Sequence, residues 1–305
     1  MRAKGRPFSD NQVGSSSRRG HVPRTSNWWR GSMIHKRGYD IVGSVALSIL
    51  ALLQLAPLAI VLLMSGKTQS QFATKPLLLT LPFHFSNYLE AWLGIRGFMF
   101  NSLTISVTTL LGDMLLSATA AYVFARYSFP LKNLLFNLLL ALLMIPGITT
   151  LFPRYILIRD LGLLGSLWGV IIPGVFGVIP FNVVVFRMYF ESLPEEIFEA
   201  ARLDGAGHVA VFSMIVVPLS WAITSSLAIL GVLGTWNDYI WPLLVLNRDD
   251  LLTVSVGLVF LSTTRNLRIG VVMAGNVLAS LPLLVLFIFA MRTFIRGLTS
   301  GALKL

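Results

Sequence analysis

Residues 191–218 read ESLPEEIFEAARLDGAGHVAVFSMIVVP, a polar and acidic segment between two long apolar segments. Five of the chain's 13 Asp and Glu residues lie between Glu191 and Asp204. A helix needs about 20 mostly apolar residues to cross a bilayer, and the flanking segments are long enough to do so. A short charged element between two membrane spans is typical of a surface that is presented to a partner.

The composition is that of a polytopic membrane protein. The chain has 305 residues, of which 55% are hydrophobic and only 12% are charged. Soluble domains carry about 25% charged residues. The sequence therefore excludes a large soluble catalytic domain, and it excludes disorder over most of its length.

Six apolar segments are long enough, or nearly so, to cross a bilayer. We expect an all-α integral membrane protein with a disordered basic cytoplasmic tail at 1–38 and a six-span transmembrane domain at 39–305. The apolar run Leu251–Leu261 is too short to cross and is expected to be interfacial or re-entrant. The expected spans lie at about 41–64, 98–124, 134–152, 167–190, 215–235 and 269–291.

The distribution of basic residues predicts the orientation. Nine of the 24 Lys and Arg residues precede residue 38. Cytoplasmic flanks of membrane spans are enriched in Lys and Arg, so both termini and residues 191–214 are expected on the cytoplasmic side of the cell (inner or plasma) membrane. The tail alone decides this assignment. The net charge of +11 is thus attributed to topology rather than to nucleic-acid binding.

The sequence offers no catalytic or metal-binding constellation. There is no Cys, and the four His residues are scattered. Disulfides, thiol catalysis and Cys-based metal sites are therefore excluded. A membrane-embedded enzyme would need clustered His or Cys residues or paired intramembrane carboxylates. We therefore predict a protein that is not an enzyme and has no metal site.

The acidic segment itself predicts a short helix. Ser192 and Glu195 have the spacing of a capping box, and Pro194 suits the first turn. The helix is expected at about 193–204, with Gly205 ending it in a left-handed conformation. Its apolar stripe is expected to comprise Leu193, Ile197 and Ala201, with Phe198 beside it. From these features alone, an ordinary interfacial connector is as good an interpretation as a docking element.

Several ordered motifs carry a family resemblance. The stretch EAARLDG at 199–205, followed by Ile215, Val217 and Pro218, resembles the EAA signature of ABC-transporter permease subunits, with Val217 where Leu is usual. The carbohydrate-uptake branch, and its smaller maltose-type inner-membrane subunit, is similar over about residues 40–305. The further motifs are NSL at 101–103, AAY at 120–122 with Ala125 and Arg126, WNDYIWPL at 236–243 and RGLTSGALK at 296–304.

The resemblance implies the ABC importer type I permease fold and a mode of action. A coupling helix inserts into a cytoplasmic ATPase dimer, which binds the ATP and Mg, so this chain binds no cofactor itself. A second permease subunit, expected to be a distinct paralogue, and an extracytoplasmic solute-binding protein complete the importer, whose solute is a sugar, polyol or sugar phosphate. The signature positions of the coupling helix are Glu199, Ala200, Ala201, Asp204 and Gly205.

Polar residues within or beside the spans leave alternatives open. Asp113 is an intramembrane acid, and an ion-coupled secondary transporter that uses it is the alternative function. Pairing of Asp113 with a polar neighbour at a helix interface is the simpler interpretation. Asn182 and Asn276 suit interhelical hydrogen bonds or a translocation pathway. At the outer end of the fifth span, Asn237 and Asp238 suit an outer gate or a contact with the binding protein. The adjacent Trp236 and Trp241 suit the same roles or interfacial anchoring.

The stretch SGKT at 65–68 resembles the end of a phosphate-binding loop. The full pattern needs Gly at position 61, where this chain has Val61. Such loops also follow a strand, whereas this stretch follows an apolar span. We therefore expect no nucleotide site here, and ATP must be bound by another polypeptide.

Overall fold

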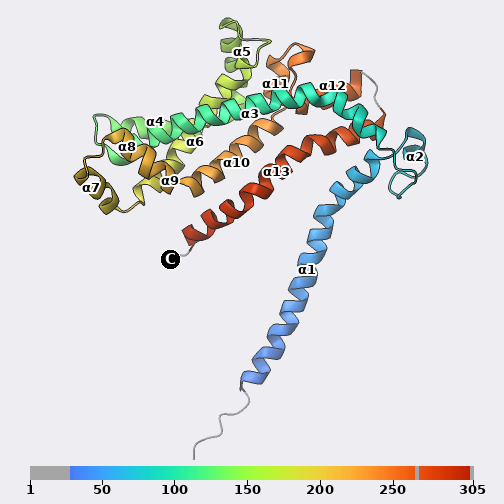
Figure 1. Cartoon of the computed structure of the whole chain (residues 1–305), viewed down its shortest axis with the longest axis horizontal. Helices are drawn as coiled ribbons and strands as arrows, with labels where there is room; N and C mark the ends of the chain where they lie inside the picture. The colour runs from blue at the N-terminus through green and yellow to red at the C-terminus, as the bar shows by residue number, and fades with distance from the viewer. Residues whose placement is uncertain (1–27, 265–267, 303–305) are drawn as a thin grey trace, which may run out of the picture. The chain divides into compact units, whose positions relative to one another are not determined.

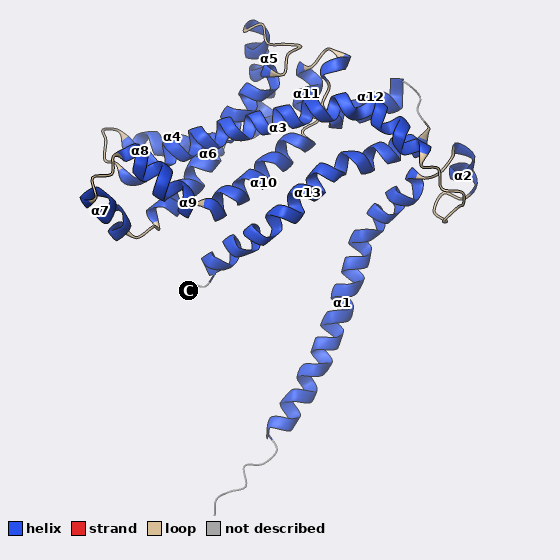
Figure 2. Cartoon of the chain, viewed as in Figure 1, coloured by secondary structure: helices blue, strands red, loops and turns tan. Residues whose placement is uncertain are grey.

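The computed structural model describes residues 28–264 and 268–302, and within these ranges it contains helices and no strand (Figures 1 and 2). Four helices are long: α1 (Trp28–Ser65), α3 (Ser86–Arg126), α6 (Trp168–Glu191) and α13 (Ile269–Ala302). The shorter ones are α2 (Gln69–Thr74), α4 (Lys132–Leu143), α5 (Leu151–Asp160), α7 (Glu195–Leu203), α8 (His208–Val211), α9 (Val217–Leu219), α10 (Trp221–Asn237), α11 (Ile240–Val245) and α12 (Val254–Thr264).

The chain divides into two compact units, Met1–Ala56 and Pro57–Leu305, and the boundary falls within α1 at its internal proline. Residues Gly43–Ser65 of α1 are long and apolar enough to cross a membrane, as predicted for the first span. The helix begins at Trp28, within the predicted tail at 1–38. Residues 1–27 of that predicted tail lie outside the described residues.

Helix α3 is the centre of the second unit. Its 41 residues correspond to a length of about 60 Å. It packs most extensively against α6 and also against α10, α12 and α13. The helix runs between the end of the unit that carries α2 and the end that carries α7 (Figure 1). It starts 12 residues before the predicted span at 98, because its first three turns are polar enough to hide the helix from a hydropathy pattern.

The third predicted span is not one helix. Helix α4 ends at Leu143, and the 3-10 turn at Gly147–Thr150 continues into α5 at an angle of 95° to α4. Pro146 is the reason, because it disfavours helical backbone at the residue before it and adopts extended backbone itself (ψ 128°). The predicted span at 134–152 thus corresponds to a bent pair of helices, and whether this pair crosses the membrane as one span stays a prediction.

The fifth predicted span is also broken. A π-helical turn at Phe212–Val216 leads into α9, and α10 follows at an angle of 75° beyond Ser220. Pro218 has no N–H to donate to the preceding turn, which is a common cause of such irregularities. In the described ranges four helices are long and apolar enough to span, or up to six if each bent pair counts as one span.

Two apolar cores hold the second unit together. The first lies around α3, α5, α6, α11 and α12, and includes Ile95, Ile171 and Val245. The second joins Tyr122 of α3 and Phe186 of α6 to Phe198 of α7. Full burial of one such phenylalanine stabilises the fold by about 1.5–3 kcal/mol. Helix α7 is therefore part of the folded unit, not a free surface segment.

The short apolar run after residue 250 forms α12, which has 11 residues and packs against α3 and α13. Two residues of the NSL motif hold its start. Asn101 Nδ2 donates to the carbonyl oxygens of Asp250 (2.8 Å) and Leu252 (3.1 Å), and Ser102 Oγ accepts from the Val254 N–H (2.8 Å). These bonds give the motif at 101–103 a structural role that the sequence did not reveal.

Candidate functional site

Helix α7 begins at Glu195, directly after Pro194. Glu195 and Glu196 lie in the first turn, where carboxylates favour the positive end of the helix dipole. The predicted capping box is absent: Ser192 still belongs to the end of α6, and its hydroxyl donates to the Tyr189 carbonyl at 2.7 Å. The helix therefore starts two residues later than expected, because α6 retains Ser192.

The predicted end of α7 is confirmed. Gly205 has a φ of +78°, in the left-handed region that favours glycine. Its N–H donates to the Arg202 carbonyl at 3.1 Å, and the Ala206 N–H donates to the Ala201 carbonyl at 2.9 Å. These two bonds form a Schellman motif, which satisfies the last carbonyls of the helix and fixes the direction of the chain beyond it.

The two faces of α7 differ in character. Phe198 and Ala201 are buried, with 4% and 7% of their surface exposed. Glu196, Glu199, Ala200 and Leu203 follow helical spacing on the other face and are exposed, Leu203 at 89%. Asp204 and Gly205 are also exposed. The signature residues are thus divided: Ala201 packs inward, and the other four face outward.

The predicted apolar stripe is correspondingly only half right. Phe198 and Ala201 are buried and Leu193 is half-buried, but Ile197 is exposed. The helix is rotated relative to the prediction because its buried face is set by Phe198, the bulkiest apolar side chain it carries. Leu203, which the sequence did not single out, becomes the most exposed apolar side chain of the helix.

One side chain from α3 holds the start of α7. Arg126 Nη1 donates to Glu195 Oε2 at 2.6 Å, and Nη2 donates to the carbonyl oxygens of Phe190 (2.6 Å) and Leu193 (3.0 Å). The guanidinium also lies 3.8 Å from the centre of the Phe198 ring. Only 14% of the Arg126 side chain is exposed, so this arrangement is better shielded than a surface ion pair.

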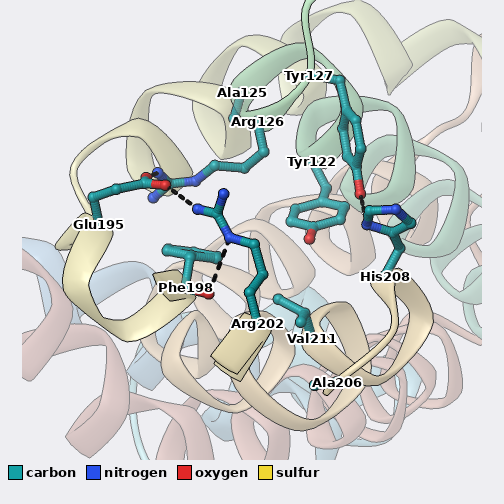
Figure 3. A pocket seen from close by; sticks show the side chains of 10 residues that line it. All are labelled: Tyr122, Ala125, Arg126, Tyr127, Glu195, Phe198, Arg202, Ala206, His208 and Val211. Atoms are coloured by element: carbon teal, nitrogen blue, oxygen red, sulfur yellow. Dashed lines mark hydrogen bonds and ion pairs between the residues drawn. The ribbon is translucent and has the colours of Figure 1, made fainter. Parts of the chain in front are cut away.

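A cavity of about 230 Å³ lies beside this cluster (Figure 3). Arg202 reaches back along α7 to pair with the other oxygen of Glu195. On the far side of the cavity, the Tyr127 hydroxyl and His208 Nδ1 form a hydrogen bond of 2.7 Å. The cavity lining comprises Tyr122, Ala125, Arg126, Tyr127, Glu195, Phe198, Arg202, Ala206, His208 and Val211.

The structure brings Asp113 and Asn182 together. Asn182 Nδ2 donates to Asp113 Oδ2 at 2.6 Å, and Ser117 Oγ donates to Asp113 Oδ1 at 2.8 Å. Both Asp113 and Asn182 are buried between α3 and α6. Their geometry is that of an interhelical pair, the simpler of the two interpretations of Asp113.

The remaining candidate pathway residues lie apart from α7. Asn276 and Asn237 are exposed, and each donates to the carbonyl four residues earlier in its own helix, Val272 and Leu233 respectively. Asp238 is half-buried and accepts from the Trp241 N–H at 3.3 Å. A role of Asn182, Asn237, Asp238 and Asn276 in solute passage stays a prediction.

The tryptophans of the WNDYIWPL motif are structural. Trp236 and Trp241 are both buried. Their indole N–H groups donate to the Ala279 carbonyl (3.2 Å) and the Gly169 carbonyl (3.1 Å). The Arg154 guanidinium lies 4.0 Å from the Trp241 ring. Neither ring can serve as an interfacial anchor, because both fill the core between helices.

The lysine of the SGKT stretch is fully engaged within the protein. Lys67 is buried, and its ammonium group donates to the carbonyl oxygens of Lys75 (2.5 Å), Pro76 (2.9 Å) and Leu78 (2.5 Å). An ammonium group has three donors, so none remains for a phosphate. The stretch organises the loop after α2, in agreement with the expectation that it is not a nucleotide site.

Comparison with known proteins identifies the family. Residues 114–300 match the model of the binding-protein-dependent transport system inner membrane component. The arabinooligosaccharides transport system permease protein AraQ of Halalkalibacterium halodurans is 37% identical over 67% of this chain and 72% of its own length. AraQ of Bacillus subtilis is 32% identical over 87% of this chain and 96% of its own length.

A further relative and a solved structure agree. The sn-glycerol-3-phosphate transport system permease protein UgpE of Yersinia pestis is 31% identical over 88% of this chain and 98% of its own length. A chain of a bacterial ABC transporter involved in alginate import has the same fold, with a TM-score of 0.77, 22% identity, and coverage of 85% of this chain and 98% of that one. These matches overturn the alternative of a secondary transporter that uses Asp113. The chain belongs to the binding-protein-dependent transport system inner membrane components, the permease subunits of ABC importers, and is a transport protein rather than an enzyme.

Proposed function

We propose that this permease subunit imports a carbohydrate or sugar phosphate and that α7 is the coupling helix on which a cytoplasmic ATPase dimer docks. The solute class rests on the relatives, whose names specify arabinooligosaccharides, maltodextrin and sn-glycerol-3-phosphate. All of these are rich in hydroxyl groups. Within this class, the solute-binding protein selects the solute before the solute reaches the permease.

The observation that carries the docking proposal is the exposed face of α7. Glu199 and Asp204 present carboxylates, which form charge-assisted hydrogen bonds with Arg or Lys of a partner. Ala200 between them keeps the surface low, and Leu203 projects an apolar side chain that is 89% exposed. Buried apolar anchors surrounded by polar contacts are typical of energetically important interface positions. A groove with an apolar pocket and a basic rim is the complementary surface.

The rigidity of α7 supports the same proposal. The helix is fixed at its start by Arg126, along one side by Phe198 and at its end by the Schellman motif at Gly205. A helix held at three places moves as one body with its unit instead of bending locally. In the proposed cycle, the ATPase subunits close around ATP, carry α7 with them, and change the permease from inward-facing to outward-facing.

The proposed assembly contains this chain, a second permease subunit that is a distinct paralogue, two ATPase subunits and an extracytoplasmic binding protein. A solved bacterial alginate transporter in complex with an alginate-bound periplasmic protein has a similar fold, with a TM-score of 0.62 at 15% identity. Helices α2 and α7 lie at opposite ends of the second unit (Figure 1). This separation suits an assembly in which α7 faces the cytoplasm and the α2 end faces the binding protein. In the proposed assembly both termini are cytoplasmic, a proposal that rests on the basic N-terminal residues.

The test uses the complete complex in proteoliposomes. The solute is first chosen by thermal-shift screening of the binding protein with arabino-oligosaccharides, maltodextrins and sn-glycerol 3-phosphate. Glu199→Lys is expected to abolish solute-stimulated ATP hydrolysis and to release the ATPase during purification, because it places a cation against the basic rim. Asp160→Lys, a charge reversal at an exposed carboxylate of α5, is expected to retain both. Normal ATPase retention and stimulation in Glu199→Lys would refute the docking role of α7.

A further inference from the structure

We propose that Arg126 is a positioning residue that transmits the movement of α7 to α3, and thereby to the helices that line the membrane domain. This inference rests on the proposed docking of an ATPase on α7. It assigns to one side chain outside the docking helix the task of carrying a displacement from that helix into the bundle.

The Arg126 side chain reaches from α3 to the corner between α6 and α7. Arg126 is the last residue of α3, and its guanidinium contacts three consecutive parts of the chain: the end of α6 at Phe190, the linker at Leu193, and α7 at Glu195 and Phe198. The Arg126 guanidinium, which belongs to neither helix, thus bonds both sides of the corner between α6 and α7. A displacement of this corner must therefore move the end of α3 or break these contacts.

Two covalent routes lead out of α7, one toward α10 and one toward α6. Toward α10 the chain passes Gly205, Gly207, the π-helical turn at Phe212–Val216 and the 75° bend beyond Ser220. Each of these can absorb motion, since π-turns and bends mark places where helical bonding is interrupted. Toward α6 the chain passes the Ser192–Pro194 linker, whose Leu193 carbonyl is itself bonded to Arg126. The contact through Arg126 is the direct polar connection from α7 to an uninterrupted helix, and it lies beside the apolar core that Phe198 shares with Tyr122 of α3.

Helix α3 has several packing partners in the second unit. It packs against α6, α10, α12 and α13, which belong to three different predicted spans and the short apolar helix. Movement of the Arg126 end of α3 therefore displaces the helices that pack against it in most of the second unit. Helix α10 has a comparable set of partners, but the bend beyond Ser220 separates it from α7 along the chain.

The chemistry of the arginine side chain suits this role. A guanidinium is a planar fork with five N–H donors, so it can satisfy a carboxylate and two carbonyls while lying flat on a phenyl ring. Lysine keeps the positive charge but offers a point charge without a flat face. Arg126→Lys therefore removes the geometry of the contact and preserves its charge.

The experiment measures coupling in the reconstituted complex as solute imported per ATP hydrolysed. Arg126→Lys is expected to retain the ATPase during purification and to keep basal ATP hydrolysis, while solute imported per ATP falls about tenfold, within the range usual for coupling between sites. Arg202→Lys is the matched control. Arg202 pairs with the same Glu195 carboxylate but lies on α7 itself and is 61% exposed, so its replacement is expected to leave coupling within about twofold of the unmodified complex.

Two further variants keep the test decisive if Arg126→Lys fails to assemble. Glu195→Gln and Phe198→Leu each weaken one contact of Arg126 and leave its bonds to the two carbonyls, so each is expected to lower solute per ATP partially. Unchanged coupling in both, or in an assembled Arg126→Lys complex, overturns the inference. If Glu199→Lys abolishes stimulation while Arg126→Lys does not, only this inference fails. If Glu199→Lys has no effect, the docking role of α7 fails instead.

Discussion

Asn182 donates a hydrogen bond of 2.6 Å to the carboxylate of Asp113, and this bond joins α6 to α3 in the interior of the second unit. The carboxylate accepts a second bond from Ser117, one turn further along α3. A buried acceptor with both oxygens engaged is a structural link between helices, and its removal leaves donors without partners.

Asp113→Leu is expected to destabilise the purified complex by about 1–3 kcal/mol, because it strands the buried donors of Asn182 and Ser117. Thermal unfolding in detergent measures the loss. The double variant Asp113→Leu with Asn182→Leu is expected to be less destabilised than the sum of the two single variants, since the first replacement already breaks the shared bond. Strictly additive losses would contradict the pairing.

Uptake by Asp113→Asn is expected to stay independent of an imposed proton gradient.

Gly205→Ala is expected to destabilise the protein by about 1–2 kcal/mol, the cost of a left-handed backbone for a residue with a Cβ. No atom lies within 4 Å of the position that this Cβ would occupy, so the effect is one of backbone conformation alone. Gly207 offers a matched control, because its surroundings are equally open and its φ is −72°. Gly207→Ala is therefore expected to be neutral or slightly stabilising. Equal effects of the two replacements in thermal unfolding would exclude this explanation.

Phe198→Ala is expected to loosen α7 from its unit. The replacement removes a buried ring and the surface on which Arg126 lies, and such truncations cost about 3–5 kcal/mol. Hydrogen exchange of the α7 amides measures the local effect, and exchange is expected to become faster there than in α3. Ile197→Ala, at an adjacent and exposed position of the same helix, is the control and is expected to leave exchange unchanged. A uniform increase over all helices would indicate global destabilisation instead.

Lys67→Met is expected to disturb the loop after α2 without changing nucleotide binding. The replacement removes the ammonium group that bonds the carbonyls of Lys75, Pro76 and Leu78, and charged hydrogen bonds contribute about 1.5–3 kcal/mol each at most. Faster proteolytic cleavage within residues 75–85 is the expected readout. Lys75→Met, which alters an exposed lysine of the same loop, is expected to cleave at the original rate. Loss of ATP binding by the complex in Lys67→Met would contradict the structural role.

The long helices could be predicted from the sequence because hydrophobic burial in lipid leaves a signal over about 20 consecutive residues. The spans at 41–64, 167–190 and 269–291 correspond to parts of α1, α6 and α13. The break at Ser220 was not predicted, and the 95° break at Pro146 is sharper than the kink that a proline within a span suggests. Proline is tolerated in many membrane helices, and α6 itself contains Pro173 and Pro180 without ending. Whether a proline bends or breaks a span depends on packing that a single sequence does not show.

The candidate site was predicted in position and end point but not in orientation. The end of α7 could be predicted because it depends only on the local backbone conformation at Gly205. The rotation of α7 depends on which side chains meet α3, and that is tertiary information. Arg126 was visible only as part of a motif at the end of the second span. Glu195 lies 69 residues after Arg126. The sequence offered two signals for their pairing: a cation at the end of a span, and an excess of acids in the segment that contains Glu195.

The length of α3 has a mechanical consequence. The hydrocarbon core of a bilayer is about 30 Å thick, roughly half the length of this helix. The helix contains no proline, and its backbone is helical throughout its 41 residues. Such a rod acts as a lever arm: for a helix of about 60 Å, a tilt of about 5° shifts one end by about 5 Å relative to the other. A rearrangement of a few ångströms at the Arg126 end thus suffices to displace the opposite end, beside α2 and the start of α13, by a distance comparable to a helical turn.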